Sequence, residues 1–321
     1  MKKLWKENNM HYTFVILHYM ALEMTKQCVD LLLKNFGNDS IHIVIVDNAS
    51  SNGSGQELKN FYISNEKISV ILNSENLGFA KGNNIGYDYA KEHFNSDFII
   101  VMNNDVLIDD LNFLKNIQPI YEKSDFAVLG PDIYNPFEIK HQNPGRLEPL
   151  TYNEAVKKHS EMIEGSKNFK KYYTKLFFNR KIRSNKILKA IFRFIKYKIL
   201  KRNGIDYSKE YINPHLHGSC YIFSKKFIES RTYAFNPATF LYYEEDILCY
   251  ECKNQNLKMF YSPEIHIQHL EDVSTNMVYK SDYKKEEFKL KEMIKSSEVY
   301  INLVKQTTDN RQQTTKTVSS I

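Results

Sequence analysis

The first 130 residues alternate short apolar segments with longer segments of helical periodicity, and this alternation restricts the possible folds more than any other feature. Apolar, largely β-branched runs predict strands at residues 12–17, 41–47, 68–72, 98–102 and 126–130. Helical patterns fall between them at residues 22–36, 55–63, 83–92 and 111–123. Such an order predicts a mostly parallel sheet with right-handed crossovers and helices on its faces. We therefore expect an α/β protein with a single doubly wound sheet.

Two of the predicted strands are followed directly by acidic and amide side chains. The strand at residues 41–47 ends in Asp47, and the strand at 98–102 is followed by Asn-Asn-Asp at 103–105. Because ligands of open α/β sheets bind outside the carboxyl ends of the strands, these side chains are expected to face a cleft. A carboxylate at such a place suits a divalent cation that shares its other positions with water or phosphate oxygens. An Asn-rich turn without a ligand is the competing interpretation of this segment.

A glycine-bearing loop lies between these strands, from Asn76 to Gly86. Gly78 and Gly82 permit close backbone approach, and the amides at the start of the following helix suit a negatively charged group, as does Lys81. A simple turn would need the same glycines, so the loop only adds to the evidence of the two strand ends.

Five motifs in this order resemble those of family 2 glycosyltransferases, which have the GT-A fold. They are FVILHY at 14–19, VIVDNASSNGS at 44–54, NSENLGFAKGNNIG at 73–86, IIVMNNDV at 99–106 and FLYYEEDILCYECKNQNLKMFYSPEIHIQH at 240–269. The chain is similar to the bacterial branch that contains rhamnosyltransferases and other transferases of capsule, O-antigen and cell-wall polysaccharide assembly. The resemblance implies that residues 1–135 form the nucleotide-sugar-binding half of the domain and residues 211–304 the acceptor-side half.

The segment 136–210 lies outside the resemblance and is expected to be a basic, partly helical insertion. Within it, residues 186–200 place apolar side chains at helical spacing beside basic ones. Such a helix can lie in the headgroup region of an anionic membrane, or it can pack its apolar stripe on the catalytic domain. The net charge of +6 also suits RNA, but no nucleic-acid motif accompanies the basic residues, and we do not expect nucleic acid as a partner.

The remaining features concern location and chain ends. No apolar run approaches the roughly 20 residues that a membrane span needs, and the start MKKLWKENNMHY lacks an apolar signal-peptide stretch. Four cysteines without a secretion signal indicate free thiols. We therefore expect a cytoplasmic protein, one that its basic helix would hold at the inner face of the cell membrane. Residues 305–321 are polar and predict a disordered tail.

The donor side of the site follows from the resemblance. Asp47 lies where the family contacts the pyrimidine ring of a UDP- or dTDP-sugar, and the backbone near His18 borders the same pocket. Lys81 is the expected phosphate neighbour. The donor-binding residues implied in this way are His18, Tyr19, Asp47, Asn48, Asn76, Gly78, Lys81, Asn83, Asn103 and Asn104.

A divalent metal, Mn²⁺ or Mg²⁺, is implied at Asp105, with His269 as a second ligand and His266 as a competing choice. The family's metal motif is usually Asp-x-Asp, and here Asn103 replaces the first acid while the second remains. A metal would act as a Lewis acid on the charge that develops on the β-phosphate, an effect worth several kcal/mol in the transition state.

Three consecutive acids supply the candidate general base. Aligned without gaps, the family's Glu-Asp-x-Asp-Leu pattern puts Glu245 at the base position and Ile247 where a second Asp is common. Asp246 is one position away but is the shorter acid that the family uses, so both stay candidates, with a preference for Asp246. Glu244 and Gly218 are expected on the acceptor side. An acidic helix start would also explain these acids without catalysis.

Together these expectations describe an inverting transferase that moves a sugar from a nucleoside diphosphate to a glycan or lipid-linked acceptor. A nucleotidyltransferase would carry a Gly-rich, Lys- or Arg-bearing loop after the first strand, where this chain has His-Tyr-Met-Ala at 18–21. The departures at Asn103 and Ile247 leave a second hypothesis open: a catalytically degenerate relative that binds glycans or serves as a scaffold subunit.

Overall fold

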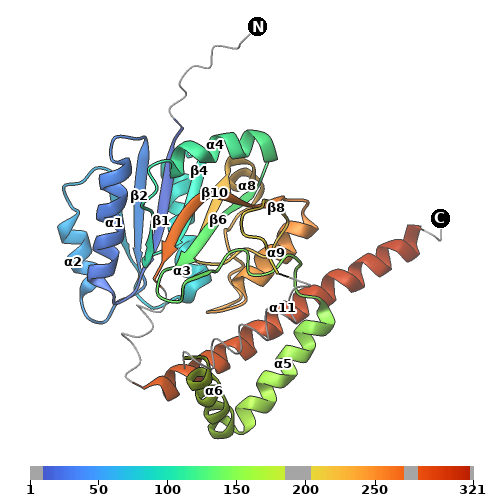
Figure 1. Cartoon of the computed structure of the whole chain (residues 1–321). Coiled ribbons are helices and arrows are strands. Elements are labelled where there is room, and N and C mark those ends of the chain that lie inside the picture. Colours follow the sequence, from blue (N-terminus) through green and yellow to red (C-terminus); the bar gives the residue numbers. More distant parts are fainter. Residues whose placement is uncertain (1–9, 185–203, 271–280, 319–321) are drawn as a thin grey trace. The chain divides into compact units, whose positions relative to one another are not determined.

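The computed structural model describes residues 10–184, 204–270 and 281–318 (Figure 1). The chain forms two compact units. Unit 1 comprises residues 1–149 and 207–278, and unit 2 comprises residues 150–206 and 279–321. These divisions differ from the boundaries expected at 135, 210 and 304, because residues 136–149 belong with the sheet and residues 279–304 belong with the segment expected as an insertion.

Unit 1 is built on one sheet with the strand order β3-β2-β1-β4-β9-β6-β10-β5, to which β7 and β8 add at β6 and β10. Its strands are β1 (Tyr12–His18), β2 (Ile41–Asp47), β3 (Ile68–Leu72), β4 (Phe98–Asn103), β5 (Val106–Leu107), β6 (Val128–Asn135), β7 (Lys140–His141), β8 (Tyr211–Ile212), β9 (Cys220–Ser224) and β10 (Met259–His269). Strands β3, β2, β1 and β4 are parallel, as are β6 and β10. Strand β9 runs antiparallel to both of its neighbours.

Helices cover both faces of this sheet, as the doubly wound prediction requires. They are α1 (Leu22–Phe36), α2 (Ser54–Phe61), α3 (Gly78–His93), α4 (Phe113–Ser124), α8 (Lys225–Ser230) and α9 (Glu244–Asn254). Along β1, Phe14 and Ile16 join the core that packs on α1, α2 and α4, while Val15 joins the core that packs on α3, α8 and α9. This alternation follows from the two-residue period of a strand. All four cysteines are buried and carry free thiols, as expected.

The predicted elements of unit 1 occur, with shifted ends. Helix α3 begins at Gly78, not at residue 83, so part of the expected glycine loop is the first turn of the helix. Strand β10 is one strand with a register shift between Ser262 and His266. A bulge of this kind increases the local twist, and it lets β10 pair with β6 on both sides of the irregularity.

Unit 2 consists of helices in the described residues: α5 (Tyr152–Lys167), α6 (Phe169–Ser184) and α11 (Asp282–Val318). Helix α11 lies beside α5 (Figure 1), where His159 Nδ1 and Ser297 Oγ are 2.8 Å apart. Residues 305–318, expected to be disordered, continue α11 as helix. Extending an existing helix avoids the cost of nucleation, so polar residues can follow a packed segment.

The basic helix expected at residues 186–200 lies outside the described residues. Of the helices that are described, none combines the length and the apolar character that crossing a membrane requires.

Candidate functional site

The carboxyl edge of the parallel strands gathers most of the residues expected on the donor side. Strand β1 lies between β2 and β4, and its register places His18 opposite Asp47 and Leu17 opposite Asn103. Two chain segments that follow β2 and β4 therefore flank the end of β1. Tyr19 and Asn103 are half-buried at this edge.

The carboxylate of Asp47 is held by the loop that follows its strand. The backbone N–H of Ser50 donates to both carboxylate oxygens, at 3.3 and 3.2 Å. Ala49 and Met20, on the loops after β2 and β1, adopt left-handed backbone with φ near +60°. Non-glycine residues in this conformation are strained, and such strain often occurs at binding sites.

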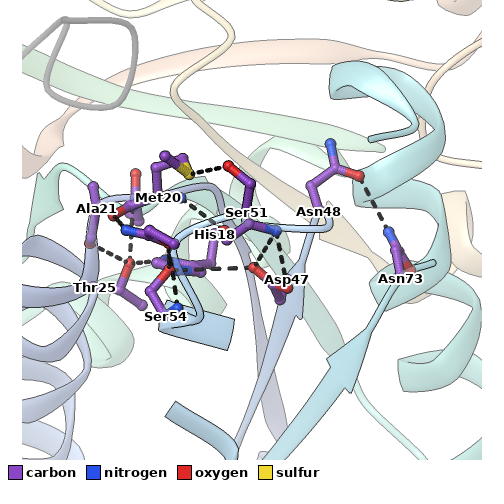
Figure 2. A network of polar contacts seen from close by, with 12 residues as sticks. His18, Met20, Ala21, Thr25, Asp47, Asn48, Ser51, Ser54 and Asn73 are labelled. Atoms are coloured by element: carbon purple, nitrogen blue, oxygen red, sulfur yellow. Dashed lines mark hydrogen bonds and ion pairs between the residues drawn. The ribbon is translucent and has the colours of Figure 1, made fainter. Parts of the chain in front are cut away.

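His18 is fully buried beneath this loop, and Figure 2 shows it between Thr25 and Ser54. Its Nδ1 lies 2.7 Å from Thr25 Oγ1 and its Nε2 lies 2.8 Å from Ser54 Oγ. Burial lowers the pKa of His18 to about 4, against the opposing influence of Asp47, whose Oδ1 is 3.8 Å away. The imidazole is therefore neutral at pH 7. The sequence predicted only that the backbone here borders the donor pocket.

Asn48 and Asn76 shape the neighbouring loop. Asn48 Nδ2 donates to Asn76 Oδ1 at 2.9 Å and to the carbonyl oxygen of Gly78 at 3.0 Å. Asn48 Oδ1 accepts from the backbone N–H of Leu77 at 3.0 Å and from Asn73 Nδ2 at 3.2 Å. These side chains hold residues 73–78 in place, so a role in donor binding would be to form the wall of the pocket.

The start of α3 contains the other expected donor residues. Gly78 has φ +76°, and a Cβ at this position would collide with the carbonyl oxygen of Phe240, which accepts from the N–H of Phe79 at 2.7 Å. The missing side chain thus serves a contact within the protein. Asn83 is buried with an unpaired Oδ1, whereas Lys81 is exposed.

The two expected metal ligands come together. Asp105 and His269 are buried, and His269 Nε2 lies 3.3 Å from Asp105 Oδ1. Strand β10 pairs with β5 at this point, and the N–H of Leu270 donates to the carbonyl oxygen of Asp105. Asp105 Oδ1 has no hydrogen-bond partner among the described residues. His266, the competing choice, instead places its Nδ1 3.2 Å from Asp132 Oδ2.

Gln142 orients the imidazole of His269, a role that was not predicted from the sequence. Gln142 Oε1 lies 2.8 Å from His269 Nδ1, and since an amide oxygen only accepts, Nδ1 carries the proton. With Nδ1 engaged as a donor, the ring directs Nε2 at a carboxylate oxygen that has no hydrogen-bond partner among the described residues. Two such atoms fit a cation, since metal-binding histidines usually donate their other N–H to an acceptor. In the described chain, no three His, Cys, Asp or Glu side chains form a larger metal cluster.

The three acids occupy the first turn of α9, directly after Tyr242 and Tyr243, which both have left-handed backbone. Glu245 lies against Gly218, where a Cβ would be 2.6 Å from Glu245 Oε1. The space beside Gly218, a residue expected on the acceptor side, is therefore filled by this carboxylate. Burial raises the pKa of Glu245.

Asp246 forms an ion pair with Arg146, and His215 Nε2 lies 3.7 Å from its Oδ1. Burial alone would raise the pKa of Asp246, but the neighbouring His215 and Arg146 outweigh it and hold the pKa below its usual value. Neither Arg146 nor His215 was predicted from the sequence as a partner of Asp246. Arg146 lies in the segment 136–210 that was interpreted as an insertion, and an isolated β-bridge pairs it with His215, which also lies close to Asp246.

Glu244 offers a test of the electrostatics at this helix start. Its side chain is buried, with Oε1 unpaired, and burial followed by repulsion from Glu245 raises its pKa from 4.5 to about 8. The folded protein therefore binds this proton more tightly than the unfolded chain, and the contribution to stability falls as the pH rises from 4.5 through 8.

Glu244→Gln is accordingly expected to raise the free energy of unfolding by about 2–4 kcal/mol at pH 9 and to change it little at pH 5. Urea unfolding at both pH values measures this difference. The exposed Glu229 provides the control, because Glu229→Gln should have no pH-dependent effect. An equal effect of Glu244→Gln at both pH values would contradict a raised pKa.

The chain is similar in sequence to known proteins. The family model described as glycosyl transferase family 2 matches residues 13–231. The chain is 26% identical over 216 residues to the low-salt glycan biosynthesis hexosyltransferase Agl10 of Haloferax volcanii, covering 67% of this chain and 54% of that protein. It thus spans about half the length of this relative.

Two solved structures share the fold. One is the mannosyltransferase PcManGT from Pyrobaculum calidifontis in complex with GDP-Man and Mn²⁺, with TM-score 0.51, 12% identity, and 91% of this chain and 70% of that chain covered. The other is GalNAc-T7 with UDP, GalNAc and Mn²⁺, with TM-score 0.53, 14% identity, and 87% and 50% covered. At these identities the likeness shows the fold alone, which is GT-A as expected.

Proposed function

Because the chain belongs to glycosyl transferase family 2, we propose that it transfers a sugar from a UDP- or dTDP-sugar to a glycan or lipid-linked acceptor, with inversion at the anomeric carbon. This proposal rests on the buried pair of Asp105 and His269. Asp105 Oδ1 faces His269 Nε2, and no hydrogen-bond donor among the described residues serves this oxygen. This pair lies at the carboxyl ends of the strands, on the side of the sheet where β2 ends in Asp47.

We propose that Asp105 and His269 hold Mn²⁺ or Mg²⁺. When bound, the metal would offset the charge on the departing nucleoside diphosphate. A site with two protein ligands leaves positions for phosphate oxygens, as is usual where such cations handle a diphosphate. PcManGT and GalNAc-T7 were both solved with Mn²⁺, which supports the same choice for this chain.

Gln142→Leu is expected to weaken Mn²⁺ binding by about 10–100-fold, because His269 would lose the acceptor that fixes its ring. Calorimetric titration of Mn²⁺ in the presence of UDP measures the affinity. Gln142→Glu keeps an acceptor and should retain binding. Gln56, exposed on α2, supplies the control Gln56→Leu. Unchanged affinity of Gln142→Leu would show that Gln142 does not orient a metal ligand.

On the donor side, we propose that the pyrimidine lies against Asp47 and the loop after it, and that Lys81 is near the phosphates. The exposed Lys81 at the first turn of α3 adds positive charge to the helix end, which favours a negatively charged group. Asn48 and Asn76 keep the loop of residues 73–78 fixed beside this pocket.

For the chemical step, we propose Glu245 as the general base. It takes the proton of the acceptor hydroxyl as that oxygen bonds to the anomeric carbon, and the bond from this carbon to the phosphate oxygen breaks with its electron pair. A raised pKa suits a base that works near neutral pH. Asp246 is less suited as the base, because its ion pair with Arg146 engages the carboxylate and holds its pKa below the usual value.

We place the reaction in cell-surface polysaccharide synthesis, in line with the glycan biosynthesis named for the relative from Haloferax volcanii. A lipid-linked acceptor would bring the protein to the inner face of the cell membrane, and the basic residues 186–200 would assist there through attraction to anionic lipids.

The decisive experiment is a screen of UDP-, dTDP- and GDP-sugars for metal-dependent release of nucleoside diphosphate, with and without glycan acceptors. A transferase releases the carrier from one donor class only when Mn²⁺ or Mg²⁺ is present. A scaffold or glycan-binding relative would bind glycans and release nothing from any donor, and this outcome would overturn the proposed activity.

A further inference from the structure

The buried His18 joins two parts of the donor edge through a continuous chain of hydrogen bonds. On one side it meets Thr25, which in turn accepts from Asn104 Nδ2 at 2.9 Å, next to the expected metal ligand Asp105. On the other side it meets Ser54, at the start of α2 and beside the loop that holds Asp47 (Figure 2). The direction of each bond can be worked out from the groups at its two ends.

At the Ser54 end, the orientation of Asn52 decides the direction. Asn52 Nδ2 donates to the carbonyl oxygen of Met20 at 2.8 Å, so Asn52 Oδ1 faces Ser54. Ser54 Oγ lies 2.7 Å from this oxygen and must give it the hydroxyl proton, because an amide oxygen has none to give. Ser54 Oγ is then an acceptor toward His18, and Nε2 of His18 is the donor.

At the Thr25 end, the neutral state of the ring decides the direction. With its one proton on Nε2, His18 accepts at Nδ1, and the hydroxyl of Thr25 shares its proton between this nitrogen at 2.7 Å and the carbonyl oxygen of Ala21 at 3.1 Å, with the shorter contact to the ring. Thr25 Oγ1 keeps a lone pair for the amide N–H of Asn104. Every donor along Asn104, Thr25, His18, Ser54 and Asn52 thus points the same way. Aligned bonds of this kind strengthen one another in a buried site.

We propose that His18 is a positioning residue for the donor: as its Nε2–H tautomer it sets Asn104 and the loop of residues 50–54 in one arrangement, so that the nucleoside and cation sides of the site form together. This inference rests on the proposed function for the identity of the ligand. The hydrogen-bond chain itself does not depend on it.

The first test reads the tautomer without any ligand. In ¹⁵N-labelled protein at pH 7, the ring nitrogens of His18 should show a protonated Nε2 and an unprotonated Nδ1. Ser54→Ala removes the acceptor at Nε2 and should shift the ring signals toward a mixture of tautomers. A ring protonated at Nδ1, or one unaffected by Ser54→Ala, would overturn the proposal whether or not the protein is a transferase.

The second test measures UDP binding by calorimetry with Mn²⁺ present. Thr25→Val keeps the shape of the side chain but removes the hydroxyl, and it should weaken UDP binding about tenfold through Asn104, as Ser54→Ala should through the loop. Because both act through one ring, the double variant should lose clearly less than the product of the two single losses.

The control is His42, a half-buried histidine on β2 that contacts Ser69 Oγ at 3.1 Å. His42→Gln should leave UDP affinity unchanged. A purely structural role of the chain predicts lower thermal stability of Thr25→Val and Ser54→Ala with unaltered UDP affinity, and this result would refute positioning. If the unaltered protein fails to bind UDP, the proposed donor is wrong, while the tautomer measurement still decides the state of His18.

Discussion

Asp105→Asn is expected to lower metal-dependent kcat/KM by about 10³-fold. The substitution keeps the size of the side chain but removes the only carboxylate of the Asp105–His269 pair. Loss of a Lewis acid effect of several kcal/mol corresponds to this factor, since each 1.36 kcal/mol is about tenfold in rate. Release of nucleoside diphosphate at varied Mn²⁺ concentration gives the measurement.

A matched control is Asp39→Asn, which changes an exposed aspartate just before β2, at the opposite edge of the sheet. It should retain full activity. Thermal unfolding of Asp105→Asn separates a lost metal site from a lost fold, because the amide keeps the shape of the side chain and Asp105 Oδ1 has no hydrogen-bond partner to lose among the described residues. Activity of Asp105→Asn within threefold of the unaltered protein would exclude Asp105 as a metal ligand.

Glu245→Gln should reduce kcat by about 10²–10⁴ while leaving UDP affinity unchanged, because a general base acts on the acceptor hydroxyl and not on the carrier. The pH profile carries a second signature. A base must be ionised, and burial raises the pKa of Glu245 above its ordinary value, so kcat should fall with decreasing pH at a higher pH than for a solvent-exposed glutamate.

Two further variants distinguish Glu245 from Asp246. Asp246→Asn breaks the ion pair with Arg146 and should cost less in kcat than Glu245→Gln. Gly218→Ala introduces a Cβ 2.6 Å from Glu245 Oε1 and should lower kcat by displacing this carboxylate, without affecting UDP binding. A larger loss for Asp246→Asn than for Glu245→Gln would transfer the role of base to Asp246.

Much of the fold could be predicted because its information is local. Each parallel strand is a short apolar run, and each crossover helix repeats its apolar residues with helical period, so the order of elements up to β6 follows from neighbouring residues alone. The antiparallel direction of β9 could not be predicted in this way. It depends on where the chain returns to the sheet after a separate helical unit.

The start of α3 shows the same limit on a smaller scale. Its glycines and asparagines looked like a loop for a ligand, but Asn48 from another strand end holds residues 73–78, and Phe240 occupies the space beside Gly78. Tertiary partners decided where this helix begins, and local propensity gave only its approximate place.

The same distinction between local and tertiary information applies to the residues of the candidate site. Asp105, His269 and Glu245 were named from residue type and motif, whereas Gln142 and Arg146 were not, because nothing local marks them. Gln142 meets His269 across 127 positions of sequence, and Arg146 meets Asp246 across 100. Such contacts arise only when segments that are distant in sequence become neighbours on folding.

The amino-acid sequence by itself determined the class of fold, the edge of the sheet at which the proposed site lies and the family to which the chain belongs. Only the tertiary structure decided the surroundings of each group at that edge: the burial of His18, the oxygen of Asp105 that has no partner among the described residues, and the opposite pKa shifts of Glu245 and Asp246. The physical reason is that periodicity is a property of adjacent residues, while burial, protonation and hydrogen-bond direction depend on the neighbours that folding brings into contact.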